Sequence, residues 1–429
     1  MIPVLRYGKD DTDKVFRRTQ LGDKERAAAV AQIVADVRAR GDEALFGYAE
    51  KFDKMTLDKT NVRISEREIA AACSEVPAGL AASLKRAAKN IYDYHARQKE
   101  KFADEYHAAG KSSVLGWRYR PLRRVGLYVP GGKASYPSTV LMTAIPALAA
   151  GVEELVVCTP NLNNPLIAAA CAECGIKEIY RVGGAQAIAA MAYGTESVPR
   201  VDLIAGPGNV YVTLAKKQVF GDVAVDMIAG PSEILVIADD GANAAWVAAD
   251  MLSQAEHDES AASILVTDSE AFAASVAAEI DAQTARLPRK EIIGKSLQNN
   301  GAIIVCADMK EAVAIANRVA PEHLEVCTRD ADEVAAAITD AGAVFVGNYS
   351  PEPLGDYFAG PSHVLPTSGS ARFSSVLSVD TFMKKISYIR YSGEDLLAAA
   401  DDIVAIAESE GFGAHANTIK RRVQDDRQS

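Results

Sequence analysis

The sequence predicts an α/β fold with two lobes, each built on a parallel sheet. From Arg124 onward, short runs of branched apolar residues alternate with alanine-rich stretches of helical periodicity. This alternation is typical of parallel strands that are covered by helices on both faces. The runs are too numerous for one sheet of ordinary width, and 429 residues exceed what a single hydrophobic core usually contains.

The expected strands all lie between residues 124 and 348. In chain order they are RVGLYVP, ELVVCTP, KEIYRVGG, VDLIAGPG, VAVDMIAGP, EILVIADD, ASILVTD, AIIVCAD, HLEVCT and AVFVGN. Helical patterns lie between most of them, at 186–194, 210–220, 242–257 and 311–320. A strand, a helix and a second strand in succession form the unit from which parallel sheets are built.

Helical and irregular segments flank this region. Apolar residues recur at helical spacing over 23–52 and 83–102. After Gly347 the chain is rich in proline and glycine, and a long irregular stretch in a compact protein is more often functional than idle. An amphipathic helix is expected over 394–410, followed by a basic tail.

Composition indicates a soluble, cytoplasmic protein. The net charge of −11 argues against a nucleic-acid or anionic membrane partner, because both require a basic surface. The first residues lack the apolar core of a signal peptide, and no apolar run is long enough to span a bilayer. The six cysteines lie mostly in apolar runs, which indicates buried, reduced thiols. We interpret the CxxC pair Cys171–Cys174 as packing, with metal or redox use as the alternative.

Two of the candidate polar pairs lie within the α/β region. Gln254 and His257 end a helix and share its inward face, where a metal ion would satisfy both side chains. The alternative is a helix terminus whose histidine bonds to the last carbonyl groups. Glu322 and His323 are adjacent at the start of a strand, so they could transfer protons at different pKa values. The alternative is an ordinary surface pair.

Two further pairs lie nearer the C-terminus. Asp356 and His363 occupy the proline-rich stretch, which could present both to a cleft, or they could be a turn-forming acid and a solvated histidine. Glu410 and His415 bracket two glycines after the last long helix. They could face one target, including a site on a neighbouring subunit, although simple helix termination also explains the glycines.

Glycine turns follow three of the expected strands, at 126–138, 182–190 and 204–213. The GxGxxG dinucleotide pattern is missing from them. In the third turn, Asn209 stands at an expected helix N-cap, where main-chain N–H groups could receive a phosphate. Each turn could be an ordinary connection, but three at strand ends make a nucleotide crevice plausible.

Ordered sequence blocks give a more specific indication. They are GLYVPGGKASYPSTVLM, GGAQAIAAMAYGT, VDLIAGPGN, DMIAGPSEILVIAD, MLSQAEHDE, APEHLEV, PLGDYFAGPSHVLPT and EGFGAHA. In this order and over essentially the whole chain, they resemble the histidinol dehydrogenase family. One departure is Ser362, where many relatives would have asparagine beside the following histidine.

The resemblance implies a fold of two incomplete Rossmann-like lobes with small N- and C-terminal helical segments. It implies an N-terminal segment at 1–23 and a first, discontinuous lobe at 24–127 and 233–380 that carries most of the site. An NAD-binding lobe at 128–232 and a C-terminal tail at 381–429 complete the expected division. The expected assembly is a homodimer in which each tail reaches the site of the partner subunit.

The resemblance also implies a role for each candidate residue. Zinc, one per subunit, would be bound by Gln254, His257, Asp356 and His415. Glu322 and His323 would be the catalytic acid–base pair, and Tyr128, Gln186 and Asn209 would bind NAD. Ser232, His363 and Glu410 would contact the substrate, together with His323 and the metal ligands.

The implied reaction is the oxidation of L-histidinol to L-histidine through L-histidinaldehyde with two NAD, the last step of histidine biosynthesis. The alternative is a paralogous NAD-dependent dehydrogenase of the same fold acting on another small hydroxy compound, such as a sulfonated diol. A non-catalytic NAD- or metal-binding module is a third possibility, which the presence of both Glu322 and His323 disfavours.

Overall fold

The computed structural model describes residues 2–16, 24–131, 136–160, 162 and 164–426. The chain forms two compact units, one of residues 1–99 and 122–382 and the other of residues 100–121 and 383–429. The first unit contains both parallel sheets. The predicted α/β class, with two parallel sheets, is therefore confirmed.

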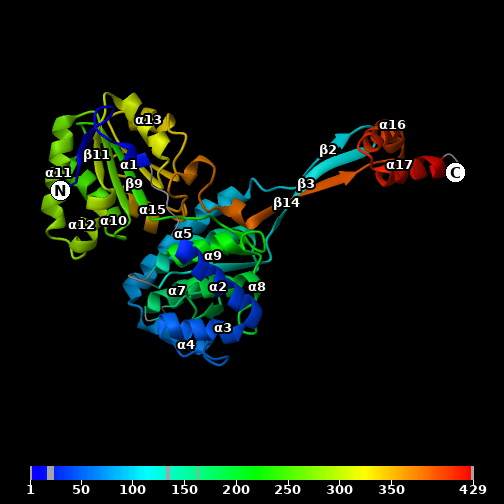
Figure 1. Cartoon of the computed structure of the whole chain (residues 1–429), viewed down its shortest axis with the longest axis horizontal. Helices are drawn as coiled ribbons and strands as arrows, with labels where there is room; N and C mark the ends of the chain where they lie inside the picture. Colours follow the sequence, from blue (N-terminus) through cyan, green and yellow to red (C-terminus); the bar gives the residue numbers. More distant parts are fainter. Residues whose placement is uncertain (1, 17–23, 132–135, 161, 163, 427–429) are drawn as a thin grey trace. The chain divides into compact units, whose positions relative to one another are not determined.

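A six-stranded parallel sheet forms one lobe of the first unit (Figure 1). Its order is β1-β11-β10-β9-β12-β13, with β1 Val4–Arg6, β9 Glu233–Ala238, β10 Ala262–Thr267, β11 Ala302–Val305, β12 His323–Cys327 and β13 Ala343–Val346. One face packs against α10 Ala244–Ala255, α11 Glu270–Thr284 and α12 Lys290–Asn300. The other packs against α1 Asp13–Phe16, α13 Met309–Val319 and α14 Ala331–Ala336. Strand β9 is buried throughout because both of its faces are covered.

A five-stranded parallel sheet forms the other lobe, in the order β6-β5-β4-β7-β8. The strands are β4 Arg124–Tyr128, β5 Glu154–Cys158, β6 Glu178–Tyr180, β7 Leu203–Ala205 and β8 Ala224–Val225. The intervening helices are α6 Pro137–Ala150, α7 Pro165–Glu173, α8 Gly184–Tyr193 and α9 Val210–Val219. Every strand expected from the sequence is thus present in one of the two parallel sheets.

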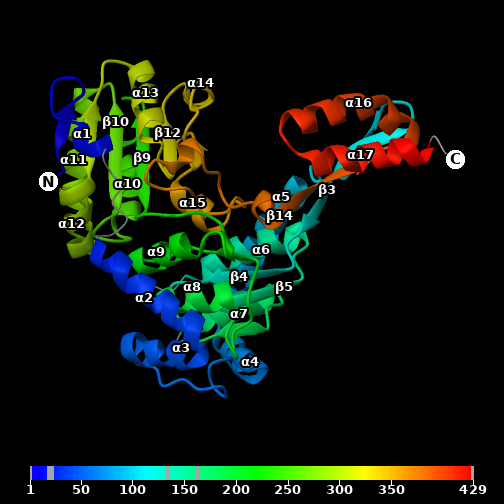
Figure 2. The same ribbon diagram turned by 45° about the vertical axis from the view of Figure 1, so that its right-hand side comes forward.

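The helices between residues 24 and 99 gather on this smaller sheet (Figure 2). They are α2 Lys24–Arg40, α3 Asp42–Tyr48, the π-helix Ala49–Asp53, α4 Glu66–Glu75 and α5 Ala78–Lys99. Helix α2 packs against α8 and α9, α4 against α7, and α5 against α6. The expected division instead placed 24–127 with the lobe of the larger sheet. The structure differs because the apolar side chains of α2, such as Val30 and Val37, enter the core beneath α8.

The second unit contains an antiparallel sheet that the sequence did not predict. Its order is β14-β3-β2, with β2 Glu105–Ala109, β3 Ser113–Pro121 and β14 Met383–Arg390. Helices α16 Gly393–Ser409 and α17 Gly413–Asp426 complete the unit. The Asp395 carboxylate accepts hydrogen bonds from the main-chain N–H groups of Lys111 and Ser112 at 2.9 and 3.0 Å. The C-terminal segment is therefore joined to residues 100–121, which the expected tail at 381–429 did not include.

The proline-rich stretch is irregular, as expected, except for α15 Glu352–Tyr357 and the 3-10 turns Ser370–Arg372 and Val379–Phe382. All six cysteines are free, and all except Cys73 are buried. Burial raises the pKa of the Cys174 thiol to about 12, which agrees with a packing role for the CxxC pair. None of the helices in the described part of the chain has the length and apolar character needed to cross a membrane.

Candidate metal and catalytic site

The candidate site lies at the amino ends of β9 and β12, which are neighbours in the six-stranded sheet. Helix α10 follows β9 and runs back over the sheet, so its last residues return to this edge. The start of β12 and the short helix α15 supply the other side chains. Residues from several separate segments of the sequence therefore meet at one end of the sheet.

Gln254 stands in the last turn of α10 and is completely buried. The stripe of Val247 and Met251 that precedes it packs into the core, as the sequence predicted. Within the described part of the chain, neither amide atom of Gln254 has a hydrogen-bond partner. A buried amide without partners is unfavourable, so this side chain is a good candidate to bind a ligand.

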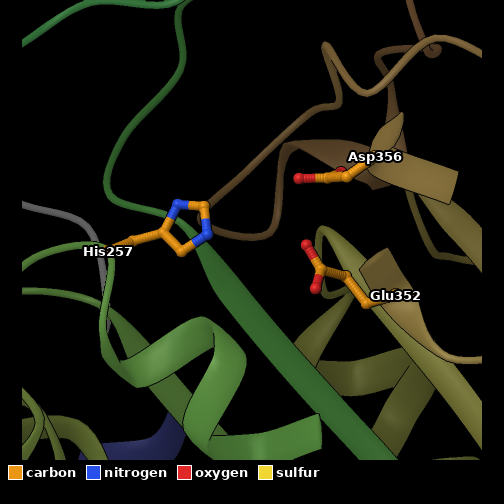
Figure 3. Close-up of side chains that lie close together, drawn as sticks. All are labelled: His257, Glu352 and Asp356. Carbon is orange, nitrogen blue, oxygen red and sulfur yellow. The ribbon is translucent and has the colours of Figure 1, made fainter. Parts of the chain in front are cut away.

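His257, Glu352 and Asp356 offer three ligand atoms that lie within 4.8 Å of one another. Figure 3 shows the imidazole of His257 and the two carboxylates pointing into the same space. Burial lowers the pKa of His257, and the charge of Asp356 only partly opposes this. The imidazole is therefore neutral at pH 7, as a metal ligand must be.

Glu352 was not predicted from the sequence. It lies one helical turn before Asp356, so both carboxylates share a face of α15. The i, i+4 spacing could have revealed the pair, but prolines at 351 and 353 made the segment read as irregular. Burial, reinforced by the charge of Asp356, raises the pKa of Glu352 to about 8.

Asp356 also joins the metal-ligand candidates to two further histidines. One carboxylate oxygen lies 3.7 Å from Nε2 of His323 and 3.9 Å from Nδ1 of His363. Burial would favour the neutral carboxyl, but the two imidazoles outweigh it and hold the pKa of Asp356 below its ordinary value. The alternative of a solvated His363 is thereby excluded, since its side chain is only 10% exposed and lies against this group.

Glu322 and His323 are buried, which excludes a surface pair. Burial raises the pKa of Glu322 to about 8, and its carboxyl accepts a hydrogen bond from the Glu233 N–H at 2.9 Å. Burial alone would lower the pKa of His323, but the carboxylates of Glu322 and Asp356 raise it to about 10. Nδ1 of His323 donates to the Glu233 carbonyl oxygen at 3.1 Å. Nε2 is buried without a hydrogen-bond partner among the described residues.

His363 is fixed at both ring nitrogens. Nδ1 donates to the carbonyl oxygen of Asp356 at 3.2 Å, and Nε2 lies 3.3 Å from the hydroxyl of Thr139 in α6. The neighbouring Ser362 donates to the carbonyl oxygen of Met142 at 2.9 Å and accepts from the N–H of Val364 at 3.2 Å. Ser362 thus fastens this loop to α6 through main-chain groups.

A cavity of about 220 Å³ opens beside these groups. Its polar lining includes His323, Asp356 and His363, and its apolar lining includes Phe345 and Leu354. The cavity therefore combines an apolar wall with a few convergent polar groups, which is the usual composition of a small-molecule site.

Among the described residues, the lining of this cavity does not include the remaining candidate substrate-binding residues. Ser232 is partly buried immediately before Glu233, and its carbonyl oxygen accepts from the N–H of Ala262 at 3.0 Å. Glu410 and His415 belong to the second unit, where both are exposed. Glu410 caps the end of α16, and the ring of His415 lies 5.1 Å from that of Phe412. The contribution of Glu410 and His415 to this site stays a prediction.

The NAD-binding candidates lie at the carboxyl ends of strands in the five-stranded sheet. The Tyr128 hydroxyl, at the end of β4, accepts from the N–H of Gly184 at 3.1 Å. Gln186, in the first turn of α8, donates to Asp53 at 3.3 Å. Asn209 caps α9 as predicted, accepting from the N–H groups of Tyr211 and Val212. Residues 132–135 of the first glycine turn lie outside the described residues.

The sequence of this chain is similar to those of known proteins. Residues 16–423 match the sequence model described as histidinol dehydrogenase. A histidinol dehydrogenase of Heliobacterium mobile is 52% identical, with 99% of this chain and 100% of that protein covered. One of Caldanaerobacter subterraneus subsp. tengcongensis is 51% identical, with 96% of each chain covered. The chain belongs to the histidinol dehydrogenase family.

A solved structure agrees with this assignment. The crystal structure of histidinol dehydrogenase from Elizabethkingia anophelis superposes with a TM-score of 0.92 at 38% identity, covering 99% of this chain and 98% of that one. The predicted membership of the histidinol dehydrogenase family and the predicted oxidoreductase class are thereby confirmed.

The zinc implied for the histidinol dehydrogenase family can be tested against the residues present. The unpartnered amide of Gln254 and the neutral imidazole of His257 lie at the same end of α10, and the carboxylates of α15 face that imidazole. Nitrogen and oxygen donors of this kind suit zinc. The residues therefore fit a divalent metal ion, with Glu352 as a carboxylate that the predicted ligand set did not include.

Proposed function

We propose that this chain oxidises L-histidinol to L-histidine with two NAD, through L-histidinaldehyde, as a cytoplasmic zinc-containing homodimer. Family membership supports the reaction class. The observation that carries the chemistry is that His323 lines the cavity and that its buried Nε2 has no hydrogen-bond partner among the described residues. A substrate hydroxyl placed there would complete the hydrogen bonding of that nitrogen.

His323 is the proposed acceptor of the hydroxyl proton. The carbonyl oxygen of Glu233 can only accept, so Nδ1 carries a proton and Nε2 of the neutral ring is the basic atom. The carboxylates of Glu322 and Asp356 raise the pKa of His323 and so strengthen it as a base. Sharing the charge of Asp356 with a bound cation would lower this pKa towards the neutral range, where the basic form is populated.

Glu322 is the proposed base for the second oxidation, in which water adds to the aldehyde. Its buried carboxyl has a pKa of about 8, so it exchanges a proton near neutral pH. Nδ1 of the adjacent His323 lies 3.6 Å from Oε2 of Glu322, and the imidazole stabilises the ionised form of this carboxyl group. The exclusion of bulk water from this pocket would keep the aldehyde from side reactions between the two steps.

The proposed metal ligands are Gln254, His257 and Asp356, together with His415 of the partner subunit. Zinc, when bound, would hold substrate nitrogen atoms and fix the orientation of the alcohol carbon. Glu352 lies beside Asp356 on the same helical face, and the two carboxyl groups interact through a side-chain hydrogen bond. Ser232, His363 and Glu410 are the proposed further contacts with the substrate.

Tyr128, Gln186 and Asn209 are proposed to bind the cofactor, and NAD supplies the hydride acceptor. All three follow strand ends of the five-stranded sheet, where nucleotides bind in related α/β folds. Gly206, in the turn before Asn209, has φ of 116°, and a Cβ there would lie 2.2 Å from the Tyr128 carbonyl oxygen. Only glycine therefore allows this turn to approach the end of β4 so closely.

The proposal is tested by measuring NADH formation from L-histidinol by the purified dimer. We expect about two NADH for each L-histidinol, because the alcohol and the aldehyde are oxidised in turn. Activity should disappear with a chelator and return with zinc. A sulfonated diol assayed in parallel tests the paralogous activity. Zinc binding without NADH formation from L-histidinol would refute the proposed reaction.

A further inference from the structure

Strand β12 carries two polar side chains on a buried face. Leu324 and Val326 point into the core on one side of the sheet, as expected for alternating residues of a covered strand. His323 and Glu325 occupy the opposite face, and both are buried. The mechanism uses His323 but gives no role to Glu325, which is 1% exposed.

The carboxyl group of Glu325 contacts the helix that carries Asp356, the proposed metal-binding carboxylate. Its Oε1 accepts a hydrogen bond from the main-chain N–H of Glu352 at 2.6 Å. Glu352 is the first residue of α15, and Asp356 follows one turn later. This contact therefore fixes where α15 begins relative to the strand that carries His323.

A second contact joins the same point to α10. The hydroxyl of Ser253 lies 3.1 Å from Oε2 of Glu352 and 2.8 Å from the carbonyl oxygen of Asp250. Ser253 immediately precedes Gln254, and His257 follows one turn later. Glu352 is thus held at its main chain by β12 and at its side chain by α10.

Folding stability does not account for a carboxyl group at position 325. Burying a carboxyl group costs free energy that an apolar side chain of similar volume would not. The carboxyl of Asp250 lies beside that of Glu325, so the two repel each other unless they share a proton in a hydrogen bond. Leucine or methionine would suit the core better. The presence of a glutamate is therefore best explained by the hydrogen bond that its Oε1 accepts.

We propose that Glu325 and Ser253 are positioning residues that hold α15 against β12 and α10, so that Asp356 and His257 face one metal ion. Glu325 acts through the main-chain N–H of Glu352, and Ser253 acts through the side-chain carboxyl group of Glu352. This inference rests on the proposed metal site, and it assigns to that site two residues outside the predicted ligand set.

The test compares Glu325→Leu, Glu325→Gln and Ser253→Ala for metal affinity, measured by zinc competition against a chromophoric chelator. Glutamine keeps the acceptor oxygen and leucine removes it. We expect Glu325→Leu to weaken zinc binding by about 10- to 100-fold, the usual effect of removing a group that orients a ligand. Glu325→Gln should stay within about threefold of the unmodified protein, and Ser253→Ala should lose about three- to tenfold.

Two further measurements separate positioning from a general loss of structure. The visible absorption spectrum of the cobalt(II)-loaded protein should change in Glu325→Leu and be restored in Glu325→Gln. Asp42→Ala is the matched control, since Asp42 is also buried and accepts from the Ser197 N–H at 3.2 Å, but in the other lobe. It should lower the melting temperature without changing zinc affinity.

The outcomes are distinct. Unchanged zinc affinity and an unchanged cobalt spectrum in Glu325→Leu would overturn the inference, as would equal losses in the leucine and glutamine variants. If Glu325→Leu does not fold, the test rests on Ser253→Ala. A zinc affinity of Ser253→Ala equal to that of the unmodified protein would then overturn the inference. Failure of the unmodified protein to bind zinc would instead refute the metal site of the proposed function.

Discussion

The main-chain N–H groups of Glu233 and Glu322 each donate to the carboxyl group of the other residue, at 2.9 and 3.2 Å. This reciprocal pair joins the first residue of β9 to the residue before β12. Glu233 also receives Nδ1–H of His323 at its carbonyl oxygen. One buried glutamate therefore orients both members of the proposed acid–base pair.

Glu322→Gln should slow aldehyde oxidation more than alcohol oxidation. The glutamine oxygen can still accept from Glu233, so the local geometry is kept while the proton acceptor is lost. Removing a general base typically costs about 10²- to 10⁴-fold in the step that needs it. Single-turnover NADH formation from L-histidinol and from L-histidinaldehyde measures the two steps separately. Equal losses in both would contradict a role for Glu322 in activating water.

A buried ion pair supports the glycine turns of the proposed cofactor site. Lys216 of α9 contacts the Asp226 carboxylate and donates to the carbonyl oxygen of Gly206 at 2.9 Å. Asp226 in turn accepts from the N–H of Gly206 at 2.7 Å. Both side chains are almost completely buried, so neither charge can be compensated by water if the other is removed.

Lys216→Met should therefore lower the free energy of unfolding by about 3–5 kcal/mol, the usual cost of leaving one buried charge unpaired. Adding Asp226→Asn should recover part of this loss, because asparagine is neutral and still accepts from Gly206. Urea unfolding measures both effects. Lys217→Met is the control, since the neighbouring Lys217 is exposed. A similar loss in both single variants would argue against the buried pair as the cause.

Except for β1, the strands of both parallel sheets could be predicted because most of them belong to apolar runs between turn residues. The antiparallel strands β2, β3 and β14 could not, because their side chains are mostly exposed or half-buried and therefore mixed in polarity. Strand β1 was missed for the same reason, because its three residues are exposed or half-buried and include the charged Arg6. Exposure therefore explains why these four strands were not predicted.

The site was only partly accessible to sequence reasoning. Each polar pair was ambiguous alone, and their convergence depends on how α10 returns to the start of β12, which local patterns do not encode. Glu233 and Glu325 lie within apolar runs, so the sequence pattern indicated strands there but no role in a site. Their roles follow only from the register between β9 and β12 and from the approach of α15.

His95 should make the folded protein less stable in mild acid. It is fully buried in α5, and burial holds its pKa below the ordinary value of 6.5, although the contact with Gln98 opposes this. The unfolded chain therefore binds this proton at a higher pH than the folded chain. The stability associated with neutral His95 is complete above about pH 6.5 and decreases as the pH falls below that value.

Urea unfolding between pH 5 and 8 tests this dependence. The stability of His95→Gln relative to the unmodified protein should increase as the pH falls from 7 to 5, because glutamine has no proton to gain. His107→Gln serves as the control, since His107 is exposed on β2. A difference between His95→Gln and the unmodified protein that does not vary with pH would contradict the assignment.

Sharing of the site between subunits can be tested by mixing inactive chains. In the proposed homodimer, Glu322 acts with His415 of the other subunit. A dimer of one Glu322→Gln chain and one His415→Asn chain then contains one site with both residues intact. Random exchange makes half of the dimers mixed, so about a quarter of the histidine-forming activity should return. If each site used its own His415, every site would lack one residue and mixing would restore nothing. Native mass spectrometry must confirm the exchange, so that absence of activity in verified mixed dimers contradicts the shared site.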